Sequence, residues 1–490
     1  ASGTSVTVDY ATSATDSYPT FTAANIVTNA DGALDVHAAD IDGDGDLDIV
    51  AASKFDNTIA WYENDGAINP SWTKNAIYTS ATGAYDVHVG DIDNDGDLDI
   101  AWAAYNGGGM AWHENDGAAN PNWTHRPMDG GDARDVFLAD LDSDGDLDIV
   151  AAFNVEDEIL WYENNGAVDP AWTIRQVATG VDGAHDVNVG DMDGDGDLDI
   201  VSASENDDTI AWYENNGGVS PFTAFVEREI ATNADHAEDV HVADMDGDGD
   251  LDIVSASFRD DTVAWYENNG AADPTFAAAN IATNVSGAHG IHVDDMDADG
   301  DMDIVVASFT DDTVRWFENN GAADPTWSAS NIATSIDGAR DVEVLDLDKD
   351  GDLDVMFTAL DADTISYYLN NGASDPTWSG GSMFSDEFDQ PHNIAIGDVD
   401  NDGDLDVVSS SHNDHKIALH TVGQSATAGS DYTTTSSTLT IAAGATSGTF
   451  TIPVLADSTA EADEVVTVKF TRPSNAFVSC LLYTSDAADE

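Results

Sequence analysis

The sequence predicts an all-β protein whose main part is an eight-bladed β-propeller. A nine-residue phrase, Asp-x-Asp-x-Asp-Gly-Asp-x-Asp, occurs eight times, and its copies begin 49 to 53 residues apart. Short apolar runs that alternate like strands surround each copy, without helical periodicity. A period of this length with four short strands per repeat is typical of propeller blades. A seven-bladed ring with one stray repeat is the alternative, and a parallel β-helix, whose coils are usually shorter, is the second.

The repeat over residues 239–290 shows the four expected strands. They lie at residues 239–244, 251–257, 262–267 and 274–283, with the aspartate phrase between the first two. Gly, Asn, Asp and Pro residues separate the runs, as expected for turns. Each repeat is therefore expected to be one four-stranded blade.

The ends of the repeat region indicate how the ring closes. Before the first aspartate phrase there is only a fourth-type strand, at residues 21–28, and after the last phrase come second- and third-type strands at 405–410 and 416–421. We expect the N-terminal strand to complete the eighth blade. Closure also removes the sheet edges that would otherwise pair with other chains.

Aromatic residues recur once or twice in each repeat. One set lies in the third strand and another follows a proline, and we interpret both as packing between blades rather than as sugar platforms. The first set is Trp61, Trp112, Trp161, Trp212, Trp265 and Trp316, with Tyr367 and Leu419 in the last repeats, and the second is Trp72, Trp123, Trp172, Phe222, Phe276, Trp327 and Trp378.

The composition excludes several function classes. The 490 residues carry 96 acidic and 13 basic side chains, a formal net charge of −83. Phosphate binding needs Lys and Arg, so nucleic acid is not an expected partner. The 42% of hydrophobic residues and 12 tryptophans indicate a packed core rather than disorder. Such acidity, which eight divalent ions would reduce only to about −67, suggests a salty or marine bacterial setting.

The sequence gives little indication of disulfides, membrane spans or targeting segments. Cys480 is the one cysteine, so no internal disulfide is expected, and no apolar run reaches the ~18 residues of a membrane-spanning helix. No signal peptide is visible at Ala1. Residues 480–490 look like the translation of a sequencing-library adapter, and we expect them to be an artefact.

Each aspartate phrase predicts a metal site. Hard cations such as Ca²⁺ bind six to eight oxygens, with carboxylates at alternate loop positions, whereas Mg²⁺ needs a tighter octahedron. Two carboxylates about 4 Å apart repel by roughly 4 kcal/mol at an effective dielectric near 20, so the loops need a cation to stay compact. We expect about eight Ca²⁺ ions, one per loop.

The candidate metal-binding aspartates are the five of each phrase. They are Asp40, Asp42, Asp44, Asp46 and Asp48; Asp91, Asp93, Asp95, Asp97 and Asp99; Asp140, Asp142, Asp144, Asp146 and Asp148; Asp191, Asp193, Asp195, Asp197 and Asp199; Asp244, Asp246, Asp248, Asp250 and Asp252; Asp295, Asp297, Asp299, Asp301 and Asp303; Asp346, Asp348, Asp350, Asp352 and Asp354; and Asp398, Asp400, Asp402, Asp404 and Asp406. In the first copy, Asp46 is expected to use its carbonyl and Asp48 to close the site in bidentate fashion.

The phrase and its strand-like flanks resemble the calcium loop of FG-GAP or VCBS repeats, which occur in integrin α-subunit propellers and bacterial surface proteins. The resemblance covers residues 21–423 and implies side-chain ligands at the first, third, fifth and ninth positions, with the seventh binding through its carbonyl. The phenylalanine-glycine and glycine-alanine-proline elements of the family are absent, so the repeats resemble the bacterial VCBS type. An EF-hand is rejected because position twelve is Ala51, not glutamate.

Beyond the repeats, the sequence changes to Ser, Thr, Ala and Gly. Residues 425–472, with 428–433 and 461–465, resemble a Calx-β domain, and residues 5–13 resemble the strand that precedes its glycine-serine-aspartate-tyrosine motif. The propeller is either inserted in a loop of one Calx-β sandwich or flanked by two truncated neighbours, or the sequence is misassembled. The expected division is 1–16 partial Calx-β strand, 17–423 propeller, 424–479 partial Calx-β domain and 480–490 artefact.

Two positions vary strongly among otherwise similar repeats. The residue before the first strand reads Leu34, Tyr85, Arg134, His185, Glu238, His289, Arg340 and His392. The position fourteen after each loop start reads Lys54, Tyr105, Asn154, Glu205, Phe258, Phe309, Leu360 and His412. In the resembled fold both positions lie on the face opposite the calcium loops. Sequence variation at fixed positions of a constant scaffold is typical of a binding surface, but exposed loop tips can also vary without any function.

These residues indicate three candidate functions. The first is a calcium-binding, secreted or cell-surface adhesion and recognition module for a glycan or a protein, and we consider an enzyme less suitable. The second is a propeller-type polysaccharide lyase or another carbohydrate-active enzyme that uses Arg to pair with carboxylates and Tyr or His as general base. The third is a passive spacer in a large adhesin.

Overall fold

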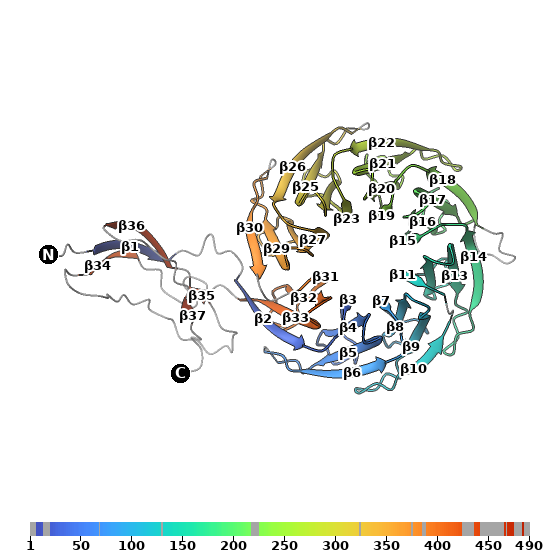
Figure 1. The fold of residues 1–490 in the computed structure, drawn as a ribbon, viewed down its shortest axis with the longest axis horizontal. Helices are drawn as coiled ribbons and strands as arrows, with labels where there is room; N and C mark the ends of the chain where they lie inside the picture. The colour runs from blue at the N-terminus through green and yellow to red at the C-terminus, as the bar shows by residue number, and fades with distance from the viewer. Residues whose placement is uncertain are drawn as a thin grey trace.

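The computed structural model describes residues 6–12, 20–67, 69–128, 131–216, 225–322, 325–373, 376–384, 389–423, 436–441, 465–466, 468–474 and 483–484. Within these residues, eight four-stranded antiparallel sheets form a closed ring (Figure 1). The expected eight-bladed propeller is therefore confirmed, and the seven-bladed alternative is wrong. No helix among the described residues has the length and apolarity to span a membrane.

Blades 1 to 4 follow each other along the chain. They consist of β3 (Ala33–Ala39), β4 (Asp48–Ser53), β5 (Thr58–Asn64) and β6 (Trp72–Tyr78); β7 (Ala84–Gly90), β8 (Asp99–Ala104), β9 (Gly109–Glu114) and β10 (Thr124–Pro127); β11 (Ala133–Ala139), β12 (Asp148–Phe153), β13 (Glu158–Glu163) and β14 (Thr173–Thr179); and β15 (Ala184–Gly190), β16 (Asp199–Ser204), β17 (Thr209–Glu214) and β18 (Val226–Ala231).

Blades 5 to 8 repeat the same order until the ring closes. They consist of β19 (Ala237–Ala243), β20 (Asp252–Ser257), β21 (Thr262–Asn268) and β22 (Phe276–Ala282); β23 (Ala288–Asp294), β24 (Asp303–Ser308), β25 (Thr313–Asn319) and β26 (Trp327–Thr334); β27 (Ala339–Leu345), β28 (Asp354–Ala359), β29 (Thr364–Leu369) and β30 (Ser379–Phe384); and β31 (Pro391–Gly397), β32 (Asp406–Ser411), β33 (Lys416–Gly423) and β2 (Thr20–Val27).

The N-terminal strand β2 closes the ring as expected. It pairs antiparallel with β33, so that Phe21 lies opposite Val422 and Asn25 opposite Ala418. The fourth strand of blade 8 therefore comes before the other three in sequence, and blades 1 to 7 lie between them along the chain. This pairing leaves the outermost strand of blade 8 in the same place as in the other blades (Figure 1).

The apolar core lies between neighbouring blades. The second strand of every blade is buried along its full length, as in β4 and β20. One core cluster combines Val50 and Trp61 of blade 1 with Val87 and Trp102 of blade 2. A blade buries both faces of its sheet against its neighbours, which explains why the second strand reads as a continuous apolar run.

The repeated aromatics pack across the blade interfaces, which confirms the structural interpretation. Trp61 meets Trp123 of the next blade edge to face, with ring centroids 6.4 Å apart. The same contact recurs between Trp112 and Trp172, Trp212 and Phe276, Trp265 and Trp327, and Trp316 and Trp378. Phe222 lies outside the described residues, and the partner of Trp161 is instead Phe225, at 5.8 Å.

A further sheet lies outside the ring (Figure 1). Its order is β34 (Ser436–Ile441), β1 (Val6–Thr12) and β36 (Val468–Ser474), and β35 (Val465–Val466) pairs with β37 (Tyr483–Thr484). The N-terminal strand thus lies between two C-terminal strands, in the pairing expected for a propeller inserted in one Calx-β-type domain. The domain boundaries stay predictions, and residues 428–433 and Cys480 lie outside the described residues.

In seven of the eight blades, a buried asparagine joins the blade to the one before it. In blades 1 to 7 the side-chain Nδ2 donates to the carbonyl oxygen of the second loop residue of the preceding blade, at 2.6 to 2.9 Å. The same Nδ2 donates to a carbonyl of its own loop. These residues are Asn64, Asn115, Asn164, Asn215, Asn268, Asn319 and Asn370.

We expect Asn164→Ala to destabilise the propeller. Its Nδ2 donates to the carbonyl oxygens of Ile92 at 2.6 Å and Leu147 at 3.0 Å, and the variant leaves both acceptors unpaired. At about 1–3 kcal/mol for each unsatisfied group, the free energy of unfolding should fall by roughly 2–5 kcal/mol. Guanidinium unfolding in excess calcium measures this, with the exposed Asn206→Ala as a control expected to change stability by less than about 0.5 kcal/mol.

Candidate calcium loops and pore-mouth site

The eight aspartate loops connect the first and second strands of each blade and share one backbone geometry. The sixth residue is always glycine with φ between 91° and 101°, where an L side chain is strained. Its N–H donates to Oδ2 of the first aspartate, as from Gly45 to Asp40 at 3.1 Å and from Gly300 to Asp295 at 2.9 Å. This turn folds the second half of the loop back over the first.

The turn brings carboxylates of the same loop together. One oxygen each from Asp40, Asp42 and Asp44 lie within 4.8 Å of one another, and so do oxygens of Asp91, Asp93 and Asp99. Several buried oxygens of the first and third positions have no hydrogen-bond partner among the described residues. They are Asp40 Oδ1, Asp93 Oδ2, Asp142 Oδ1, Asp191 Oδ1, Asp297 Oδ1, Asp346 Oδ1 and Asp398 Oδ1. Unpaired, buried and converging carboxylate oxygens fit a hard cation.

The ninth aspartate is buried in all eight loops, with an exposed fraction of at most 1%. In blade 1, Asp48 Oδ2 accepts the N–H of Ile41 at 3.2 Å and Oδ1 accepts that of Asn64 at 2.8 Å. Both oxygens therefore already bind backbone donors, and a bidentate metal role would have to use their remaining lone pairs. The ninth position also ties the loop to the bridging asparagine.

The seventh aspartate directs its side chain away from the loop. A Cβ on Gly66 would lie 1.9 Å from Asp46 Oδ2, so glycine is needed there to leave room for this carboxylate. Asp46 Oδ1 accepts a hydrogen bond from Asn401 of blade 8 at 2.5 Å, and Asp146 accepts one from Asn94. Because this side chain is hydrogen-bonded to the neighbouring blade, the backbone carbonyl is the group that position seven could offer to a cation, and its metal role stays a prediction.

Burial and mutual repulsion raise the pKa values of several loop carboxylates. Burial and, to a smaller extent, the neighbouring carboxylate of Asp144 raise the pKa of Asp142 to about 6. Burial likewise raises the pKa of Asp148 to about 7, with Asp142 adding to the effect. A bound divalent cation would compensate both causes by favouring the ionised form.

We expect calcium removal to destabilise the protein. Each ion that binds the folded state alone contributes about 2.7 kcal/mol at a concentration one hundred times its Kd, and the loops act in parallel. The melting temperature should fall in EGTA and recover on addition of calcium. Magnesium at the same concentration should restore less, and an unchanged melt in EGTA would contradict the calcium assignment.

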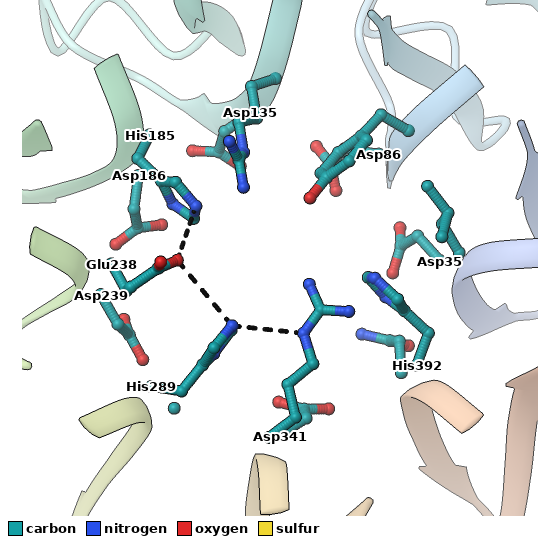
Figure 2. Close-up of a pocket in the computed structure, with 16 residues that line it drawn as sticks. Asp35, Asp86, Asp135, His185, Asp186, Glu238, Asp239, His289, Asp341 and His392 are labelled. Atoms are coloured by element: carbon teal, nitrogen blue, oxygen red, sulfur yellow. Dashed lines mark hydrogen bonds and ion pairs between the residues drawn. The ribbon is translucent and has the colours of Figure 1, made fainter. Parts of the chain in front are cut away.

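The eight variable residues that the sequence analysis placed just before the first strands are instead the second residues of these strands, because each strand begins one residue earlier, and they meet at the other end of the central channel. Leu34, Tyr85, Arg134, His185, Glu238, His289, Arg340 and His392 line one cavity of about 250 Å³ (Figure 2). They lie at the starts of the innermost strands, whereas the aspartate loops follow the ends of these strands. The structure therefore brings together all eight residues that the sequence comparison singled out, on the face expected.

One side of this pore mouth is cationic. The Arg134 guanidinium lies 5.3 Å from the centroid of the Tyr85 ring, and the Lys54 ammonium lies 5.6 Å from it. Burial alone would raise the pKa of Tyr85, but the charges of Arg134, Arg340 and Lys54 outweigh it and lower the pKa below its ordinary value. The phenol is thus easier to deprotonate than a free tyrosine.

The opposite side combines histidine and glutamate. Glu238 Oε2 lies 2.8 Å from His185 Nε2 and 3.8 Å from His289 Nε2, and Arg340 Nε lies 3.3 Å from His289 Nε2 (Figure 2). Burial would raise the pKa of Glu238, but His185, His289 and Arg134 lower it well below its ordinary value. Glu238 is therefore an ionised, buried acid.

The turns between second and third strands add a partial second layer around this mouth. Glu205 pairs with Arg134, with Oε2 to Nη1 at 3.3 Å, and Phe258 lies edge to face with His289. His412 stacks against His392 at 6.3 Å. Part of the second variable set therefore contacts the first, as expected for one surface.

A ring of aspartates one residue further along was not singled out from the sequence. Asp35, Asp86, Asp135, Asp186, Asp239 and Asp341 line the same channel (Figure 2). The first five accept a backbone N–H of the next blade, as Asp35 does from Val87 at 2.9 Å and Asp239 from Ile291 at 2.8 Å. The constant aspartate after a variable residue was the available signal, and its role is to hold neighbouring blades.

Burial and facing carboxylates shift the titration of this ring. Burial, and then the charge of Asp86, raise the pKa of Asp35 and of Asp135 well above the ordinary value. Blade 6 has Gly290 in this place, where a Cβ would lie 2.6 Å from the carbonyl oxygen of Arg340. Close approach of the backbone therefore explains the glycine in blade 6, and blade 8 has Asn393 in the corresponding place.

Family models match most of the chain. The FG-GAP-like repeat model matches residues 40–102, 91–151, 140–202, 191–255, 246–306, 295–357 and 346–409. The chain belongs to the FG-GAP-like repeat family. Successive matches overlap because each extends into the loop of the following blade, so seven matches are consistent with eight blades. The Calx-beta domain model matches residues 392–487, which include blade 8 strands as well as β34 to β37.

Several solved structures are similar to this chain at low identity. An Agrocybe aegerita lectin described as recognising non-reducing terminal N-acetylglucosamine is 20% identical, with a TM-score of 0.46, over 73% of this chain and 92% of that one. Rhamnogalacturonan lyase YesW is 10% identical (TM-score 0.41; 81% and 91% covered), and the V. cholerae biofilm matrix protein Bap1 is 12% identical (TM-score 0.45; 81% and 88%). No curated protein matches the chain.

Proposed function

We propose that this FG-GAP-repeat protein is a calcium-stabilised recognition module of a secreted or cell-surface protein, and that it binds a carboxylate-bearing glycan or protein at the pore mouth. Lys54, Arg134 and Arg340 at this mouth are three of only 13 basic residues in a chain with 96 acids. This concentration is the observation that carries the proposal. The charges of all three act on Tyr85 and lower its pKa.

Two of these cations are available to a ligand. Within the described part of the chain, neither Lys54 nor Arg340 has a carboxylate within ion-pair distance, although Arg340 approaches His289. Several basic residues elsewhere are paired with acids, for example Arg175 with Glu163 and Arg228 with Glu214 and Asp273. A guanidinium binds a carboxylate through two parallel hydrogen bonds, and Tyr85 and the histidines suit sugar hydroxyls.

The proposed roles of the two faces differ. Calcium in the aspartate loops would stabilise the blades, and the variable face would select the partner. Extracellular fluid supplies the calcium that such oxygen-rich loops need, which supports a secreted or surface location. Membrane lipids and nucleic acid are unsuitable partners for a surface of this net charge.

We expect Arg340→Ala to weaken binding of an acidic glycan. A charged hydrogen bond contributes about 1.5–3 kcal/mol, so the Kd should rise roughly 10- to 100-fold. A glycan array that includes uronic acid polymers identifies the ligand, and titration calorimetry measures the change. Arg228→Ala, on the outer strand β18, is the matched control and should leave Kd unchanged; equal losses in both variants would contradict a pore-mouth site.

A second candidate function is a polysaccharide lyase, favoured by the lowered pKa of Tyr85 beside Arg134 and Arg340. The arginines would neutralise a uronate carboxylate, and the Tyr85 oxygen would remove the proton from the adjacent carbon while the glycosidic oxygen leaves by β-elimination.

Ultraviolet absorbance of unsaturated uronate distinguishes the two functions. If the lyase function holds, product should accumulate with wild-type protein and not with Tyr85→Phe, which keeps the ring but lacks the phenol. Binding without any absorbance change favours the recognition module. Neither binding nor turnover would leave the passive spacer as the function.

A further inference from the structure

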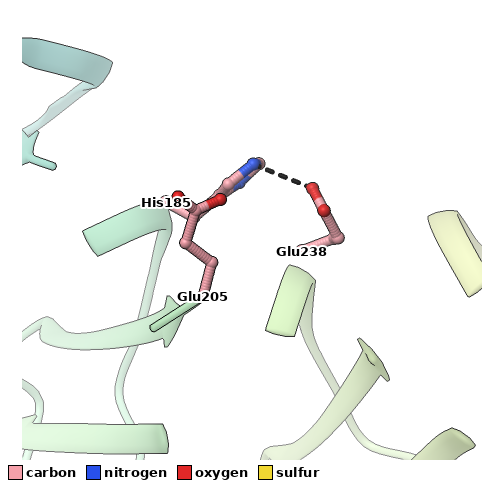
Figure 3. A group of neighbouring side chains, drawn as sticks. All are labelled: His185, Glu205 and Glu238. Atoms are coloured by element: carbon pink, nitrogen blue, oxygen red, sulfur yellow. Dashed lines mark ion pairs between the residues drawn. The ribbon is translucent and has the colours of Figure 1, made fainter. Parts of the chain in front are cut away.

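A group of metal-binding side chains lies at the rim of the pore mouth, apart from the aspartate loops. His185 belongs to β15 and Glu205 to the turn after β16, both in blade 4, whereas Glu238 lies in β19 of blade 5 (Figure 3). One ligand atom from each lies within 4.8 Å of the others. His236, directly before β19, approaches the same two carboxylates.

The separations fit a small tetrahedral ion. Zinc bonds of about 2.0–2.1 Å place neighbouring ligand atoms roughly 3.3 Å apart. Here His185 Nε2 is 2.8 Å from Glu238 Oε2, His236 Nδ1 is 3.2 Å from Glu238 Oε1, and His236 Nδ1 is 3.8 Å from Glu205 Oε2. These three separations lie within about 0.5 Å of the distance expected between neighbouring zinc ligands.

The imidazole nitrogens of this group are buried and have few hydrogen-bond partners. Nδ1 and Nε2 of His185 and Nδ1 of His236 are buried and without a hydrogen-bond partner among the described residues. The polar neighbours of these nitrogens are carboxylates: Glu238 Oε2 lies 2.8 Å from His185 Nε2, and Glu238 Oε1 lies 3.2 Å from His236 Nδ1. Buried imidazole nitrogens normally have a partner, and a metal ion is one that satisfies nitrogen lone pairs.

The donor set and its charge select a class of metal. Two carboxylates carry two negative charges, which match a divalent ion, and the side chains of Glu238 and Glu205 are only 9% and 17% exposed. Imidazole donors suit zinc and its transition-metal neighbours, whereas calcium prefers oxygen alone. The group therefore differs in chemistry from the eight aspartate loops.

We propose that His185, Glu205, Glu238 and His236 bind one zinc-type divalent ion, which cross-links blades 4 and 5 at the pore mouth. The site does not depend on the identity of the glycan or protein ligand. It does adjoin Arg134, whose Nη1 lies 3.3 Å from Glu205 Oε2, so guanidinium and metal share this carboxylate.

Zinc titration of the full chain in saturating calcium tests the proposal, because calcium then occupies the oxygen-only loops. We expect one zinc ion per chain by mass spectrometry of the metal content, with calorimetric affinity in the micromolar range or tighter. Cobalt in place of zinc should give the intense visible absorption of four-coordinate Co²⁺. Only millimolar zinc binding, or a weak six-coordinate cobalt spectrum, would overturn the proposal without need of any variant.

Variants locate the site. His185→Gln and Glu238→Gln should each raise the zinc Kd more than about 100-fold, since even outer-shell changes cost 10- to 100-fold. His292→Gln is the matched control, because His292 Nδ1 faces Glu343 at 3.8 Å in a simple pair. An unchanged melting temperature in calcium verifies that the variants fold. Zinc binding that persists in both ligand variants would contradict the assignment.

Arg134→Gln separates this site from the proposed ligand site. Loss of the guanidinium that shares Glu205 should tighten zinc binding several-fold, whereas it should weaken binding of an acidic glycan. Weaker zinc binding in this variant would contradict a metal role for Glu205. Loss of glycan binding with intact zinc binding would leave the metal site standing even if the proposed function needs revision.

Discussion

The ring depends on one repeated connection, the buried asparagine that joins the loop of its own blade to the loop of the blade before. Asn164, for example, donates its backbone N–H to Asp148 at 2.7 Å and its amide to Ile92 of blade 2 at 2.6 Å. Through these bonds the ninth aspartate, the loop and the neighbouring blade form one network. A buried network of this kind is stable only when every member is satisfied, so the seven blades that contain the asparagine must keep the same loop shape.

This constraint explains why one end of the propeller is uniform and the other varied. At the loop end, the glycine at position six, the ninth aspartate and the asparagine are each required by a specific bond or by a positive φ. At the pore mouth, the link between blades is made by the aspartate ring through backbone N–H groups, as from Val136 to Asp86. The residue beside it is therefore free to differ in every blade, and eight different side chains can meet there.

The two ends also use charge in different ways. The loops gather carboxylates whose mutual repulsion calls for an added cation. At the pore mouth the carboxylates already have partners within the protein, because Arg134 pairs with Glu205 and His185 approaches Glu238. An acidic chain thus keeps a locally mixed electrostatic surface where the channel opens, which is the property that a selective binding site needs.

The blade number, the strand order within a blade and the closing role of residues 21–28 could be predicted from the sequence, because period and phase are local properties of a repeat. The position of the variable ring followed from the same repeat phase. Tertiary structure alone decided which side chains meet at the mouth: Glu205 of blade 4 reaches His236 and Glu238 of blade 5 only because these two blades converge at the channel. It also decided that Phe225 packs against Trp161. Contacts between blades depend on radial distance and side-chain direction, and one repeat read along the chain contains neither.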